Sequence, residues 1–108
     1  MFVIFDHLDC TDRELDQTKW YIFQILNQFG FERKAVDIMQ RDALHLFESW
    51  LNLFHPSLFE SDNGSVMVVS TQSRDNPDQR GLLVVIVLSD MQTEFGLELA
   101  HKIRLIVE

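Results

Sequence analysis

The order of hydrophobic and polar residues divides the chain into segments with strand periodicity and segments with helix periodicity. The first five residues, MFVIF, form an apolar run rich in β-branched and aromatic side chains, which predicts a buried strand. From Thr11 onward the apolar residues recur at helical spacing, and Gly30 follows the last of them as the glycine after a helix end does. The predicted buried face of this first helix consists of Leu15, Ile22, Leu26 and Phe29.

A second helical pattern follows the first and is predicted to end near Phe54. His55 stands before Pro56, and the residue before a proline disfavours helical backbone. The start of this helix is open, because residues 31–36 (FERKAV) form either its first turns or a linking segment. Two helices in succession predict a helical hairpin. The apolar stripe of the second helix consists of Met39, Ala43, Phe47, Trp50 and Phe54.

Two strands are predicted in the second half of the chain, after a connection that contains the turn signal Asn63-Gly64. They are residues 65–70 (SVMVVS) and residues 82–88 (LLVVIVL), and a polar loop joins them. The second run has no polar alternation. It therefore predicts a central strand that the fold covers on both faces. Alternatively, the fold covers one face of the strand and a second copy of the chain covers the other.

The last helix is predicted to begin at Ser89, with Gln92 at the capping-box position. Leu97 and Leu105 fall outside its apolar stripe. The chain ends in an apolar run, residues 103–108 (IRLIVE), which predicts either a short closing strand or packing against a neighbour such as another copy of the chain. The predicted buried face consists of Met91, Phe95, Leu99, Ile103 and Ile106.

These elements predict a single α+β domain, residues 1–108, with the order β-α-α-β-β-α and a short C-terminal strand as a variant. Its 108 residues are enough for one hydrophobic core and not for two. Three or four strands with helices on one face make a two-layer sandwich. A ferredoxin-like variant fits best, with the helical hairpin as the first crossover.

The net charge of the chain limits the kinds of partner that it can bind. The chain has 17 acidic and 9 basic residues, a formal net charge of −8, which disfavours nucleic acid and an anionic membrane surface. It allows a basic protein partner, and it also simply promotes solubility. The longest apolar run, Leu82 to Leu88, is too short to span a membrane, and the acidic N-terminal segment does not resemble a signal peptide. We therefore expect a cytoplasmic protein.

Ligand-type and acid/base side chains are dense in residues 6–16, DHLDCTDRELD. Helix chemistry explains part of this density, because Thr11 and Glu14 form the T-x-x-E pattern of a capping box. Asp12 and Glu14 also suit the positive end of the helix dipole. The helix start is therefore the simpler interpretation of these residues.

The remaining candidates occupy a predicted strand-to-helix loop. They are Asp6, His7, Asp9 and Cys10. The alternative hypothesis is a metal- or thiol-dependent enzyme or sensor, with Cys10 as nucleophile or ligand and His7 as base or ligand. The spacing matches no familiar site, and the neighbouring carboxylates disfavour a thiolate. We therefore predict no catalytic residue, no metal and no cofactor.

Trp20 lies at the centre of the polar face of the first helix, between Gln17 and Gln24. An aromatic side chain on that face predicts a second contact surface, because tryptophan and tyrosine are favoured anchors of protein interfaces. The alternative is that the helical hairpin or the loop after Phe54 covers Trp20 within the same fold. The predicted partner-binding residues are Trp20, Tyr21, Phe23 and Gln24.

The sequence thus favours a small acidic protein–protein interaction module of regulatory type over an enzyme. An adaptor, an inhibitor and an immunity-type protein all fit. We expect a homodimer that binds a basic or mixed protein partner through electrostatic steering followed by burial of Trp20. A small-ligand site between sheet and helices is a third hypothesis, which the sequence does not separate from the first.

Overall fold

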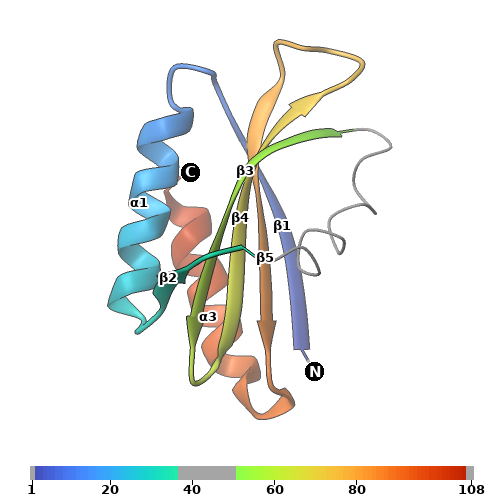
Figure 1. Ribbon diagram of the computed structural model, residues 1–108. Helices are drawn as coiled ribbons and strands as arrows, with labels where there is room; N and C mark the ends of the chain where they lie inside the picture. The colour runs from blue at the N-terminus through green and yellow to red at the C-terminus, as the bar shows by residue number, and fades with distance from the viewer. Residues whose placement is uncertain (1, 37–50, 107–108) are drawn as a thin grey trace.

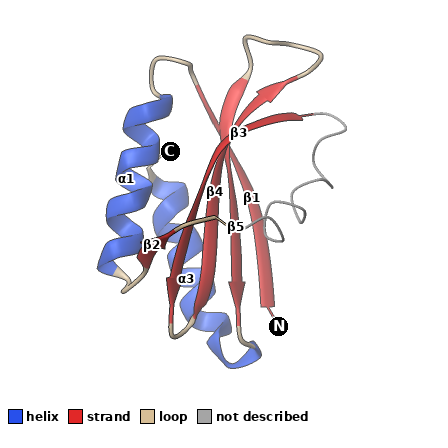
Figure 2. Ribbon diagram, in the orientation of Figure 1, coloured by secondary structure: helices blue, strands red, loops and turns tan. Residues whose placement is uncertain are grey.

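A computed structural model describes residues 2–36 and 51–106, which form an antiparallel sheet with two helices on one of its faces (Figure 1). The five strands lie in the order β1-β5-β4-β3-β2 (Figure 2). The strands are β1 (Phe2–Cys10), β2 (Glu32–Lys34), β3 (Leu51–Ser61), β4 (Gly64–Ser73) and β5 (Arg80–Leu88). The helices are α1 (Leu15–Gln28) and α3 (Thr93–Leu105), and a 3₁₀ turn η2 (Asp90–Gln92) precedes α3.

The predicted β-α-α-β-β-α order and the ferredoxin-like sandwich are wrong, since the described elements follow the order β-α-β-β-β-β-α. The main error concerns residues 51–61, which were assigned to a helix end and a connection but form β3. Pro56 is accommodated in β3 by a bulge, where the register against β4 shifts between Phe54 and Ser57. His55 has a φ of 51° there. The His55-Pro56 signal therefore marks a strand bulge and not a helix end.

Further differences concern the segments around that helix. Residues 32–34 form β2, so α1 is followed by a strand in place of the second arm of a helical hairpin. The predicted apolar stripe from Met39 to Trp50 lies outside the described residues, and Phe54 lies in β3. The apolar C-terminal run continues α3 as far as Leu105 and is not a closing strand up to that residue.

The C-terminal end of α1 confirms the predicted glycine signal, whereas the start differs: α1 begins at Leu15, its N-cap Glu14 makes no side-chain capping hydrogen bond, and Thr11 and Glu14 bond each other in the turn before the helix. The Glu14 amide donates to Thr11 Oγ1 at 3.3 Å, and the Thr11 hydroxyl donates to Glu14 Oε1 at 2.7 Å. At the other end Gly30 has a φ of 89°, a conformation that glycine adopts without a Cβ penalty. Its amide bonds the Asn27 carbonyl, and the Phe31 amide bonds the Leu26 carbonyl, which together form a Schellman motif.

The start of α3 differs from the predicted cap. Ser89 makes no side-chain capping hydrogen bond, and its carbonyl accepts from the Gln92 amide at 3.0 Å to form η2. Met91 was assigned to the buried face but is 94% exposed, because it lies in η2 before the helix begins. Leu99 and Ile103 are buried as predicted.

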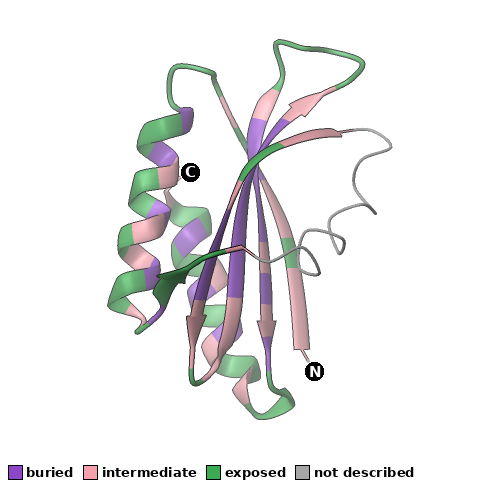
Figure 3. Ribbon diagram, viewed as in Figure 1, coloured by how far each residue is buried: buried purple, intermediate pink, exposed green. Residues whose placement is uncertain are grey.

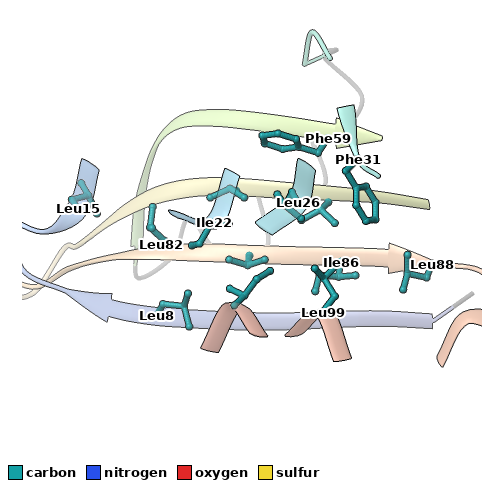
Figure 4. Packing of buried hydrophobic residues seen from close by; sticks show 14 residues of the cluster. Leu8, Leu15, Ile22, Leu26, Phe31, Phe59, Leu82, Ile86, Leu88 and Leu99 are labelled. Carbon is teal, nitrogen blue, oxygen red and sulfur yellow. The ribbon is translucent and has the colours of Figure 1, made fainter. Parts of the chain in front are cut away.

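Burial is concentrated in the central strands, as Figure 3 shows for β4 and β5. The predicted central position of residues 82–88 is confirmed, because β5 pairs with β1 on one side and β4 on the other. Alternate residues of β5 face the helices and join one apolar cluster with both helices (Figure 4). That cluster includes Leu8, Ile22, Leu26, Phe31, Phe59, Leu82, Val84, Ile86, Leu88, Leu99 and Ile103. Leu83 joins a smaller cluster on the opposite face with Leu58, Met67 and Val69.

Two leucines of α3, one buried and one exposed, test the assignment of buried and exposed positions on this helix. Leu99 is fully buried, so Leu99→Ala is expected to lower the free energy of unfolding by about 2–5 kcal/mol through lost burial and a residual cavity. Leu105→Ala is the matched control, because Leu105 is exposed on the same helix and its loss is expected to cost about 0.5 kcal/mol or less. Urea titration followed by circular dichroism measures both. Equal losses would contradict the placement of α3.

Candidate functional site

The outward face of α1 carries the predicted partner-binding residues. Its exposed positions from residue 17 to the helix end are Gln17, Trp20, Tyr21, Gln24, Asn27 and Gln28. None of these side chains is charged, although charged residues make up 24% of the chain. The nearest charges on α1 are the exposed Asp16, one helical turn before Trp20, and the half-buried Lys19. A surface helix normally turns its charged residues to solvent. The absence of charge from these positions, together with two aromatic rings, distinguishes this face from an ordinary solvated helix surface.

Trp20 and Tyr21 form the centre of this surface. Trp20 is 56% exposed and Tyr21 is 41% exposed. Their ring centroids lie 5.7 Å apart with an interplanar angle of 58°, within the range of a favourable aromatic pair. The Gln17 amide donates to the Tyr21 hydroxyl at 3.1 Å, which holds the tyrosine against the helix. The two rings are therefore in contact with each other and exposed.

This exposure bears on the two interpretations of Trp20. Among the described residues, the segment after Phe54 does not cover Trp20, and the second arm of the predicted helical hairpin lies outside the described residues. The segment that includes Phe54 forms β3, part of the sheet. Gln24 lies one helical turn after Trp20 and is exposed beside it.

Phe23 has a different position from the other three predicted residues. Its ring packs on Phe59 of β3 with a centroid distance of 4.9 Å. The Arg33 guanidinium lies 5.1 Å and the Lys19 ammonium 5.8 Å from the centroid of the same ring. Burial lowers the pKa of Lys19, and the neighbouring Arg33 lowers it further. Phe23 thus attaches α1 to the sheet.

The four candidate metal or catalytic residues lie in β1 and not in a loop, which corrects the predicted strand-to-helix connection. Because side chains alternate along a strand, Asp6 and Cys10 point to the helix face while His7 and Asp9 point to the opposite face. Arg104 of α3 donates to Asp6 Oδ1 at 3.3 Å. The pleat therefore separates the group into two pairs, and no common ligand sphere results.

Among the described residues, His7 makes an arrangement that resembles catalytic geometry. Its Nε2 lies 2.7 Å from Thr71 Oγ1 of β4, and its Nδ1 lies 3.4 Å from Asp9 Oδ1. The ring reaches β4 across β5 at Gly81, where a Cβ would come within 2.7 Å of it. Thr71 is fully buried, however, so a substrate cannot reach its hydroxyl. This contact links three strands and was not visible in the sequence, because its partners are 64 residues apart.

Cys10 lies at the end of β1 beside a shallow hollow that Thr11, Glu14 and Arg80 also line. Burial raises the pKa of the Cys10 thiol, and the Glu14 carboxylate raises it further, while Arg80 acts in the opposite direction. Arg80 is itself paired with Asp12 at 2.8 Å. The environment thus favours the neutral thiol, which is the weaker nucleophile and metal ligand.

The other features of the described residues provide no further candidate site. In residues 2–36 and 51–106, no group of three or more histidine, cysteine, aspartate or glutamate side chains is placed to hold a metal ion. None of the described helices has the length and apolar character that crossing a membrane requires. A second hollow lies at the β3–β4 turn and is lined partly by Glu60, Asp62 and Asp90.

Comparisons of the chain with protein families, curated proteins and solved structures give no match. The functional assignment therefore rests on the geometry of this chain. The α1 surface carries the most exposed aromatic side chain among the described residues, Trp20, with Tyr21 beside it.

The state of Cys10 can be measured directly, because it is the single cysteine of the chain. Its raised pKa leaves less thiolate at pH 7, so the folded protein is expected to react with iodoacetamide more slowly than N-acetylcysteine. The alkylation rate of the folded protein should also rise over a higher pH range than the rate of the free thiol does. The same protein in denaturant is the control and should react like the free thiol. Faster alkylation in the folded state would restore the thiol hypothesis.

Proposed function

We propose that the protein is a small acidic interaction module, cytoplasmic and homodimeric, which binds a protein partner through the outward face of α1. The observation that carries this proposal is the exposed Trp20–Tyr21 pair on a helix whose exposed positions after Asp16 carry no charge. Interface centres share this composition, since they are enriched in tryptophan and tyrosine and depleted of charge.

The energetics of docking follow from these residue types. Trp20 and Tyr21 present large apolar areas, and aromatic side chains have few rotatable bonds, so their burial costs less conformational entropy than that of long flexible side chains. The glutamine and asparagine side chains around them can hydrogen-bond to a partner. No charge has to be removed from water at the centre of the contact, which avoids the largest desolvation cost.

The excess of acidic over basic residues favours partners with a basic or mixed surface. A net charge of −8 attracts a basic or mixed surface over long range and increases the association rate at low ionic strength. Asp12, Glu14 and Asp16 lie at the N-terminal end of α1, next to the aromatic surface, where they can guide the approach of such a partner. An adaptor, an inhibitor and an immunity-type protein all act by this mode of binding.

Trp20→Ala tests the proposal. The partner is first identified by cross-linking in the source cells and then purified, and its affinity for each variant is measured by calorimetry. Loss of a central aromatic anchor is expected to weaken binding by about 2 kcal/mol or more, with unchanged circular dichroism.

Met91→Ala is the control, because Met91 is an exposed apolar side chain in η2 and not on α1. It should bind with wild-type affinity, and added salt should weaken the wild-type complex. A Trp20→Ala variant that binds the partner with wild-type affinity would contradict the proposal.

A further inference from the structure

Two cations lie together on the flank of α1 that faces β2. Arg33 of β2 stands opposite Phe59 of β3, and cross-strand partners point to the same face of a sheet. Phe59 belongs to the apolar cluster under the helices, so Arg33 is on the helix face. The ring of Phe23 contacts both charges, the Arg33 guanidinium at 5.1 Å from its centroid and the Lys19 ammonium at 5.8 Å. Two positive charges thus meet at one aromatic ring in an acidic chain.

The two cations lack an acidic partner in contact. Within residues 2–36 and 51–106, neither Lys19 nor Arg33 forms an ion pair with a carboxylate. The Lys34 ammonium, by contrast, lies 3.4 Å from a Glu32 carboxylate oxygen. Arg33 donates instead to the hydroxyl of the buried Ser57 at 3.4 Å, which helps to hold the guanidinium over the ring. The repulsion between the two cations is therefore not offset by an ion pair.

This environment favours the neutral amine of Lys19. Burial lowers the pKa of Lys19, the Arg33 guanidinium lowers it further, and Asp16 on the preceding turn of α1 acts in the opposite direction. A lysine that is partly removed from water and lies beside another cation becomes nucleophilic closer to neutral pH. The side chain is half-buried, so a part of it remains accessible to a small reagent in solution.

From this geometry we propose that Lys19 is a modification site, whose amine accepts an acyl group from an acyl phosphate. Arg33 attracts the phosphate group and so raises the local concentration of the donor beside the amine. The neutral amine attacks the carbonyl carbon, a C–N amide bond forms, and the C–O bond to phosphate breaks. The phosphate leaves with the electron pair of that bond, and the proton of the amine passes to water or to the released phosphate.

Acylation changes the charge beside the aromatic surface. Lys19 is the basic residue within α1 and directly precedes Trp20. An amide carries no charge, so acylation removes this positive charge from the surface that we assign to partner binding. A basic partner then meets less repulsion there. This consequence rests on the proposed function, whereas the reaction at Lys19 does not.

Competitive acetylation tests the site, because the chain has three lysines that serve as references for one another. The folded protein is treated with acetyl phosphate near neutral pH, and peptide mass spectrometry follows acetylation at Lys19, Lys34 and Lys102. Lys19 is expected to react about threefold faster or more than the exposed Lys102. In denaturant the rates should converge. A Lys19 that reacts no faster than Lys102 in the folded protein would overturn the proposal.

Variants of β2 test the part of Arg33. Arg33→Gln removes the neighbouring charge and is expected to lower the Lys19 rate about threefold or more, with Lys102 unchanged. Arg33→Lys keeps a positive charge and should keep most of the rate. Lys34→Gln is the matched control, since side chains alternate along a strand and Lys34 points to the opposite face. Circular dichroism checks the fold of each variant. A wild-type Lys19 rate in Arg33→Gln would refute the site.

A neutral acyl donor separates the two effects of Arg33. With the N-hydroxysuccinimide ester of acetic acid, Lys19 should remain the fastest lysine, but by a smaller factor than with acetyl phosphate. Added salt should reduce the preference only for the anionic donor. An equal preference with both donors at every salt concentration would contradict the attraction of the phosphate.

The consequence for binding has its own measurement. Lys19→Gln carries a neutral amide in place of the ammonium and is expected to bind a basic partner about twofold more tightly, whereas Trp20→Ala loses binding. Unchanged affinity of Lys19→Gln would contradict the effect of acylation on binding. The acetylation rates are measured on the protein alone, so failure of the modification site and failure of the proposed function are distinguishable.

Discussion

The burial of β5 on both faces and along both edges is the constraint on which the rest of the structure depends. Its seven consecutive apolar residues, Leu82 to Leu88, cannot be satisfied by one covered face. Helices α1 and α3 cover one set of alternate side chains, and β1 and β4 take up its backbone hydrogen bonds. The positions of both helices and of the edge strand follow from this arrangement, since each of them contacts β5 or a strand beside it.

The same arrangement explains where the aromatic surface lies. α1 lies toward β3 and is attached through Phe23, so its opposite side faces solvent and carries Trp20 and Tyr21. α3 lies toward β1, where Arg104 pairs with Asp6 and Leu97 remains exposed. The two helices thus share one core but turn unlike side chains outward, an aromatic pair on α1 and a leucine on α3.

The acidic residues near the N-terminus illustrate how tertiary contacts change the meaning of a sequence motif. Asp6, His7, Asp9 and Cys10 are close in the chain, which suggested a common site. A strand turns alternate residues to opposite faces, and each then finds a distant partner, such as Arg104 for Asp6 and Thr71 for His7. Pairings over so many residues carry no local signal. The density of these residues therefore reflects strand and helix-start requirements more than a shared chemistry.

Local physical rules were enough to determine the end of α1 at Gly30, the central position of residues 82–88, and Trp20 as an aromatic residue on the exposed face of its helix. These features depend on neighbours within a few residues or on hydrophobic periodicity, so the sequence by itself determined them. Tertiary structure decided the path around Pro56, because a proline ends a helix or sits in a strand bulge depending on whether a neighbouring strand is there to pair. It also decided which strand lies at the edge, because strand order depends on long-range pairing that no local pattern encodes.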